Sequence, residues 1–151
     1  RTAPRPLVSR KVNMIEMELN KIVIDEKRHD QLIALKEKGG NRVLPIVIGL
    51  NEASAIKLKI SGFSPPRPLT HDLIFTMLND LGATIEKVII DKLEENTFHA
   101  KIIIKTAAGQ SKSIDARPSD SIALAVRGHA PIFVEDSIIQ QYEIFDKDKQ
   151  K

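Results

Sequence analysis

The sequence predicts an α+β domain in which antiparallel strands come in sets of three and each set is followed by a helix. Two observations lead to this prediction. Residues 14 to 24 and 97 to 106 alternate apolar and polar side chains, which is typical of half-buried strands. Short turns separate such runs closely enough for hairpins, and apolar residues recur with helical spacing after each set.

The first set of strands is expected before residue 50. Residues 14 to 24 (MIEMELNKIVI) form the first strand, and the run from 31 to 38 resumes strand character after the polar break DEKRHD. The turn GGN leads into a third strand at 42 to 49. Because Pro45 has no N–H to donate to a neighbouring strand, we expect this strand at a sheet edge or at a bulge.

Two helices are expected next. Residues 50 to 60 fit a helix with Asn51 as its N-cap, and SGFSPPRP (61 to 68) is a loop. The following helix is expected to have Thr70 as its N-cap and to end at Gly82. Its apolar residues recur with helical spacing, namely Leu73, Ile74, Met77, Leu78 and Leu81.

The second half of the chain repeats this order. Strands are expected at 84 to 91, 97 to 106 and 111 to 116, a buried helix at 117 to 128, and a last helix over the core at 135 to 145. Both halves then read strand, acidic break, strand, turn, strand, helix. We therefore interpret the chain as an internal duplication.

Composition indicates one ordinary globular domain, with 151 residues, 42% hydrophobic and 28% charged. No apolar run approaches the roughly 20 residues of a membrane span. The absence of cysteine excludes disulfides and cysteine-ligated metals. Because no segment resembles a signal peptide, we expect a cytoplasmic protein with no membrane partner.

The charge of the chain is unevenly distributed. The net charge is +3, but residues 1 to 13 contain four basic side chains and no acid, so the remainder is nearly neutral. We interpret residues 1 to 13 as a basic arm, disordered or left from cloning, 14 to 146 as one domain, and 147 to 151 as a frayed tail. A nearly neutral body counts mildly against a dedicated nucleic-acid binder.

Two Arg-Pro corners carry the candidate chemistry, since the sequence has no phosphate-binding glycine loop, zinc-protease or serine-hydrolase motif. In RPLTHD, Arg67 can bind a phosphate, His71 can transfer protons near neutral pH, and Asp72 can hold a divalent cation. The same residues also suit an ordinary helix start, with Thr70 as the cap and Asp72 in the first turn.

The second corner, IDARPSDSIALA, has similar chemistry. Asp115 ends a strand, and Ser119 and Asp120 lie in a first helical turn, where free amides favour an anion. An ion pair between Arg117 and Asp120 is the structural alternative. Because the following helix is apolar on almost every face, its polar start needs partners. We therefore expect Arg117, Asp115 and Asp72 to belong to one network.

Three segments, LPIVIGLNEASAI, PPRPLTHDL and IDARPSDSIALA, resemble in order and spacing the bifunctional nuclease domain family, which is widespread in bacteria. The resemblance covers roughly Met14 to Val134 and is that of a bacterial single-domain member. It implies a duplicated fold whose antiparallel sheet curls around helices, and association into homo-oligomers. Plant members of this family are reported to degrade both DNA and RNA.

The resemblance favours a phosphodiesterase acting on RNA or DNA. A Mg²⁺ or Mn²⁺ ion held by Asp72, Asp115 or Asp120 would activate water, and no organic cofactor is expected. The predicted roles are catalysis for His71, Asp72 and Asp120, phosphate binding for Arg67, Arg117 and Ser119, and support for Glu52 and Thr70.

Two other functions stay open from the sequence. One is a non-enzymatic oligomeric module that binds or regulates a partner, in which the same Arg, Asp and His side chains form a structural network. The other is nucleic-acid binding without cleavage. With one Tyr, five Phe and no Trp the chain offers few stacking platforms for bases, so this second function ranks last.

Overall fold

The computed structural model describes residues 13–25, 27 and 30–149, with side chains as far as Glu143. The predicted basic arm therefore lies outside the described residues, apart from Asn13. Within the described part, no helix is both long and apolar enough to cross a membrane.

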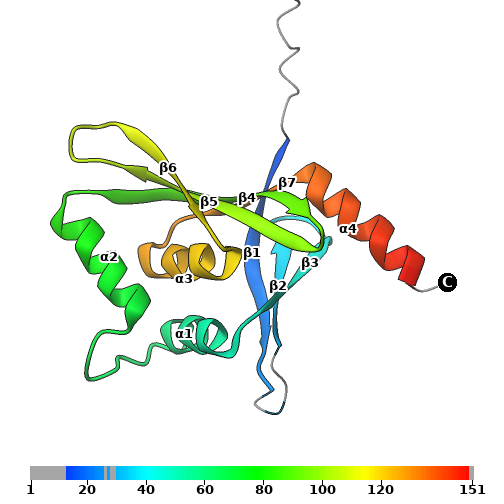
Figure 1. Cartoon of the computed structure of the whole chain (residues 1–151), viewed down its shortest axis with the longest axis horizontal. Coiled ribbons are helices and arrows are strands. Elements are labelled where there is room, and N and C mark those ends of the chain that lie inside the picture. Colours follow the sequence, from blue (N-terminus) through cyan, green and yellow to red (C-terminus); the bar gives the residue numbers. More distant parts are fainter. Residues whose placement is uncertain (1–12, 26, 28–29, 150–151) are drawn as a thin grey trace, which may run out of the picture.

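The described residues form a single sheet of seven strands, which organises the fold. Its order is β3-β2-β1-β7-β4-β5-β6, so β3 and β6 lie at the edges and the sheet is open (Figure 1). Pro45 lies in edge strand β3, as its missing N–H predicts. The strands are β1 (Met14–Val23), β2 (Gln31–Glu37), β3 (Val43–Ile48), β4 (Thr84–Glu94), β5 (Thr97–Lys105), β6 (Ser111–Ala116) and β7 (Ile132–Glu135).

The α+β prediction is confirmed, but it omitted β7. This strand of four residues pairs antiparallel with β1 and parallel with β4, and so joins two antiparallel halves into one sheet. Residues 132 to 135 are too short a run to show alternation, and helix α4 follows immediately. The same order of three strands and a helix occurs on both sides of β7. A duplication as the origin of this order stays a prediction.

Strand β4 extends further than expected. The predicted break after residue 91 is part of the strand, which ends at Glu94, and the chain turns at Glu95 and Asn96 with positive φ angles of 49° and 63°. Asp91 thus lies within β4, where its carboxylate is 3.0 Å from the Lys101 ammonium on β5.

In the part of the chain that the structure describes, four helices complete the fold: α1 (Leu50–Ile60), α2 (Thr70–Asp80), α3 (Pro118–Gly128) and α4 (Asp136–Lys149). In Figure 1, α1, α2 and α3 lie on one side of β1 and α4 lies on the other. Helix α3 packs against β4, β5, α1 and α2, so it occupies the centre of the core. Its residues Ile122 and Ala123 have no exposed surface, which confirms the prediction of a buried helix.

The caps of α1 and α2 differ from the prediction. Gly49 rather than Asn51 is the N-cap of α1, and Leu69 rather than Thr70 is the N-cap of α2. At α2 the Leu69 N–H donates to Asp72 Oδ2 over 2.9 Å, so a carboxylate in the first turn satisfies a free amide. The loop before α2 is as predicted.

The outer surface of α2 is more apolar than the surface of an ordinary amphipathic helix. Of its apolar residues with helical spacing, only Leu78 packs against the core. Leu73, Ile74, Met77 and Leu81 are 37% to 75% exposed.

Candidate functional site

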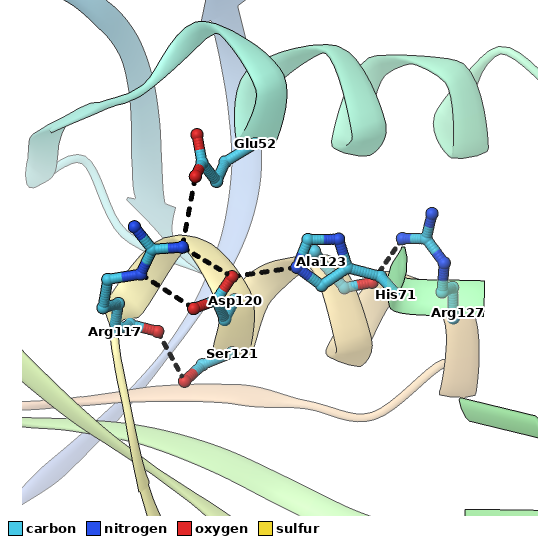
Figure 2. Close-up of polar contacts among 7 residues, drawn as sticks. All are labelled: Glu52, His71, Arg117, Asp120, Ser121, Ala123 and Arg127. Atoms are coloured by element: carbon cyan, nitrogen blue, oxygen red, sulfur yellow. Dashed lines mark hydrogen bonds and ion pairs between the residues drawn. The ribbon is translucent and has the colours of Figure 1, made fainter. Parts of the chain in front are cut away.

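The first turns of α1, α2 and α3 meet at one point on the surface of the core (Figure 2). Arg117 Nη2 donates to Glu52 Oε1 over 3.1 Å, which joins α3 to α1. His71 Nε2 lies 2.9 Å from Asp120 Oδ1, which joins α2 to α3. Side chains from the two Arg-Pro corners therefore meet in space. We call Glu52, His71, Arg117 and Asp120 the corner cluster.

Asp120 is the centre of the corner cluster. Its Oδ2 accepts from Arg117 Nε over 2.8 Å, and its Oδ1 accepts from Arg117 Nη2 over 3.2 Å and faces His71. Burial raises the pKa of the Asp120 carboxyl, but hydrogen bonds from Arg117 and His71 outweigh this effect and hold the pKa below its ordinary value. Asp120 is therefore a carboxylate at neutral pH.

Arg117 is the exposed member of the corner cluster, with 65% of its side chain accessible. Its backbone is extended, as the residue before Pro118 requires, and its carbonyl accepts from the Ser121 hydroxyl over 3.0 Å. The hydrogen bond to Asp120, followed by that to Glu52, raises the pKa of the guanidinium. A permanently charged group is thus presented to solvent in a defined orientation.

A second pair ties α2 to α3 beside the corner cluster. Arg127 Nε donates to Asp72 Oδ1 over 2.7 Å, and Arg127 Nη1 donates to the Ala123 carbonyl over 2.8 Å. Burial raises the pKa of the Asp72 carboxyl, but the Leu69 N–H and Arg127 lower it more, so the net pKa lies below the ordinary value.

Arg127 was missed from the sequence although a signal was present. An arginine inside a helix that is apolar on almost every face must find a buried partner, and only 3% of this side chain is exposed. The expected single network of Arg117, Asp115 and Asp72 is wrong. Arg117 contacts Asp120 of α3 and Glu52 of α1, whereas Asp72 contacts Arg127 of α3.

The remaining predicted site residues lie around the corner cluster without joining it. Asp115 is exposed on β6, opposite Lys101 of β5. Arg67 and Thr70 are exposed. Ser119 is 5% exposed in the first turn of α3. Within the described ranges, none of the side chains of Arg67, Thr70 and Ser119 makes a hydrogen bond or ion pair to the protein.

A divalent cation does not fit the carboxylates in this arrangement. Among the described residues, no group of three His, Cys, Asp or Glu side chains could hold a metal ion. Both oxygens of Asp120 and both oxygens of Asp72 already accept hydrogen bonds or face His71. Metal dependence stays a prediction, and we derive no chemical step through a metal.

Several known proteins are similar to this chain in sequence. A family model described as "Bifunctional nuclease domain" matches residues 32–147. An uncharacterized protein of Mycobacterium tuberculosis is 41% identical over 128 residues, which are 85% of this chain and 76% of that protein. Bifunctional nuclease 2 of Oryza sativa subsp. japonica is 28% identical over 118 residues, 76% of this chain and 36% of the plant protein.

Bifunctional nuclease 1 of Arabidopsis thaliana is 25% identical over 112 residues, 73% of this chain and 34% of that protein. The chain therefore spans about a third of the length of these two plant relatives. The family model, by contrast, covers most of the chain, including the corner cluster. This chain is a member of the bifunctional nuclease domain family.

Proposed function

We propose that this protein is a nuclease that hydrolyses phosphodiester bonds of RNA, DNA or both at the corner cluster. One observation carries the proposal: an imidazole and a carboxylate from separate helices lie 2.9 Å apart, beside an exposed guanidinium that contacts the same carboxylate. Family membership and the plant relatives, which are named bifunctional nucleases, support this reaction class.

Arg117 is the group we assign to phosphate binding. Its guanidinium is held by Asp120 and Glu52 on one side, while most of its surface is open to solvent. The α3 N-terminus starts without a side-chain cap, so its free amides and the nearby Ser119 hydroxyl add donors suited to an anion. Arg67, exposed before α2, is the second phosphate-binding candidate from the sequence and stays a prediction.

We assign proton transfer to His71 and Asp120 as a pair. If Nε2 of the neutral ring donates to Asp120, Nδ1 is left as the acceptor, so the carboxylate determines the tautomer and orients the ring. The His71 side chain is 10% exposed and that of Asp120 is 30% exposed. Asp120 is therefore the member of the pair on the solvent side.

The test is cleavage of end-labelled single-stranded RNA and DNA in Mg²⁺, in Mn²⁺ and in EDTA. We expect His71→Gln and Asp120→Asn to lower the rate on the order of 100-fold or more, as removal of a general acid or base does. Arg117→Ala is expected to raise KM more than it lowers kcat. The EDTA arm decides the predicted requirement for a metal.

Lys101→Ala is the matched control, because Lys101 forms an exposed ion pair with Asp91 on the sheet, outside the corner cluster. It should cleave like the unaltered protein, and all variants should have the same far-UV circular dichroism. Equal cleavage by folded His71→Gln and Asp120→Asn proteins would assign the activity to a contaminant.

A non-enzymatic binding or regulatory module is the second candidate, and one observation favours it. Two carboxylates, Glu52 and Asp120, contact the single guanidinium of Arg117, so the corner cluster is not a strongly cationic site. On this reading the contacts stabilise three helix starts. Absence of cleavage in every metal condition, together with loss of stability in the Arg117→Ala protein, would support this function.

A further inference from the structure

The loop between α1 and α2 (Figure 1) forms one wall of a cavity of about 330 Å³. Such a volume is at the lower end of the roughly 300–1,000 Å³ that small-ligand sites occupy, so it suits one flat ring system rather than a larger group. The lining includes two residues at the end of α1, one at the start of α2 and three prolines of the loop, namely Lys59, Phe63, Asp72, Pro65, Pro66 and Pro68.

Phe63 is the aromatic side chain of this cavity. Among the phenylalanine side chains that the structure describes, it is the only exposed one, with 55% of its surface accessible. Phe75 and Phe98, by contrast, pack against the core. A single exposed apolar side chain is ordinary by itself, so the position of this ring decides what it can do.

The backbone holds Phe63 in a defined position. The Gly62 N–H donates to the Lys59 carbonyl over 3.2 Å, and the Phe63 N–H donates to the Leu58 carbonyl over 3.1 Å. These two bonds are the Schellman motif that ends many helices, and the prolines that follow restrict the backbone of the loop. The ring is therefore presented at a preformed cavity, where little ordering cost opposes binding.

The cavity lies beside the corner cluster. Asp72, which lines the cavity, directly follows His71 on α2. Lys59, which also lines it, is seven residues after Glu52 on α1. Since seven residues of a helix span about 10 Å, a short strand of nucleic acid can place a phosphate at the corner cluster and a flanking base at the cavity.

The charges at the cavity suit such a strand. Lys59 is an exposed cation of the lining, and Arg67 is exposed between two lining prolines of the loop. The carboxylate of Asp72 is paired with the buried guanidinium of Arg127, so its charge is compensated. Phosphates next to a base in the cavity would therefore meet cations.

We propose that Phe63 stacks on an unpaired base of the strand that the corner cluster cleaves, so that the substrate is single-stranded RNA or DNA. A base in a duplex is paired and covered by its neighbours, and so cannot stack on a side chain. Because every base has a π-face, stacking on Phe63 selects single strands without selecting a sequence. This inference rests on the proposed nuclease function, from which it takes the nucleic acid.

Fluorescence anisotropy tests the proposal, with the full chain in EDTA and a labelled single strand of about ten nucleotides, a length within the range of single-strand sites. We expect Phe63→Ala to bind on the order of tenfold more weakly, and Phe63→Trp to bind at least as tightly as the unaltered protein. Met77→Ala is the matched control, because Met77 is also 55% exposed but lies outside the cavity lining, and it should bind normally.

Two further ligands isolate the base. A strand with abasic sites in place of its bases, and a duplex of the same length, should each bind equally to the unaltered protein and to Phe63→Ala, since neither offers a free base. Equal affinity of these two proteins for the complete single strand would overturn the proposal. No binding of that strand by the unaltered protein would also overturn it.

The binding assay separates this inference from the proposed nuclease. Weaker binding by Phe63→Ala, in a protein that cleaves under no condition, would support the base site and refute the nuclease. Normal binding by Phe63→Ala, together with cleavage that His71→Gln abolishes, would support the nuclease and refute the base site.

Discussion

Replacement of Arg127 by methionine should destabilise the protein far more than the same change at Arg117. Both arginines lie on or directly before α3, and both donate to a carboxylate. Their side chains differ in exposure, at 3% for Arg127 and 65% for Arg117. Because methionine keeps most of the apolar volume of the side chain, the comparison isolates the charged group.

The expected magnitude follows from the burial of each pair. Breaking a buried ion pair costs about 3–5 kcal/mol, because one charge is left without a partner. Asp72 is 29% exposed and keeps its hydrogen bond from the Leu69 N–H, so we expect a smaller loss of about 2–3 kcal/mol for Arg127→Met. For the exposed Arg117→Met we expect a loss of at most about 1 kcal/mol.

Urea unfolding followed by circular dichroism measures both losses, with the slope of the transition compared between variants. Adding Asp72→Asn to Arg127→Met should recover about 1 kcal/mol, because the unpaired charge is removed while Asn can still accept from Leu69. If Arg127→Met is as stable as the unaltered protein, or if the two arginine variants lose the same free energy, the argument from burial is refuted.

Three further predictions concern carboxyls, turns and the core. The folded-state pKa values of Asp72 and Asp120 lie below the ordinary 3.8. The two carboxylates therefore stabilise the folded state fully above pH 3.8, and this stabilisation is lost as the pH falls below that value. Midpoints of urea unfolding measured at low pH will show the loss. Gly82→Ala should lower the melting temperature more than Gly109→Ala. Both have φ near +80°, but a Cβ at 82 would lie 2.9 Å from that of Ala107, whereas one at 109 meets nothing. Ile122→Ala should cost about 2–5 kcal/mol in urea unfolding.

Much of the fold could be predicted because its signals are local. Alternation along β1 and β5, glycine turns and the apolar sequence of α3 are each contained within a dozen residues. Strand β7 could not be predicted in this way, since it has only four residues and its pairing with β1 and β4 is set by distant parts of the chain.

The corner cluster could be predicted only in part, because some of its signals are local and its contacts are not. The sequence shows that His71 and Asp120 each lie at a helix start, but their contact depends on how α2 packs against α3. Of the partners predicted for Arg117, only Asp120 contacts it, and Asp115 and Asp72 do not. The structure instead supplies Glu52 from α1, because the starts of α1 and α3 are adjacent in space.

The position of β7 has a consequence for biosynthesis. Met17 near the start of the domain pairs with Ile132 near its end, and β7 separates β1 from β4 in the sheet. Until β7 leaves the ribosome, the edges of both β1 and β4 lack this partner, and unpaired strand edges promote association with other chains. We therefore expect completion of the sheet to be a late step in folding, since it closes a loop that spans most of the chain. A polypeptide that stops before residue 132 is expected to aggregate even though all other strands are present.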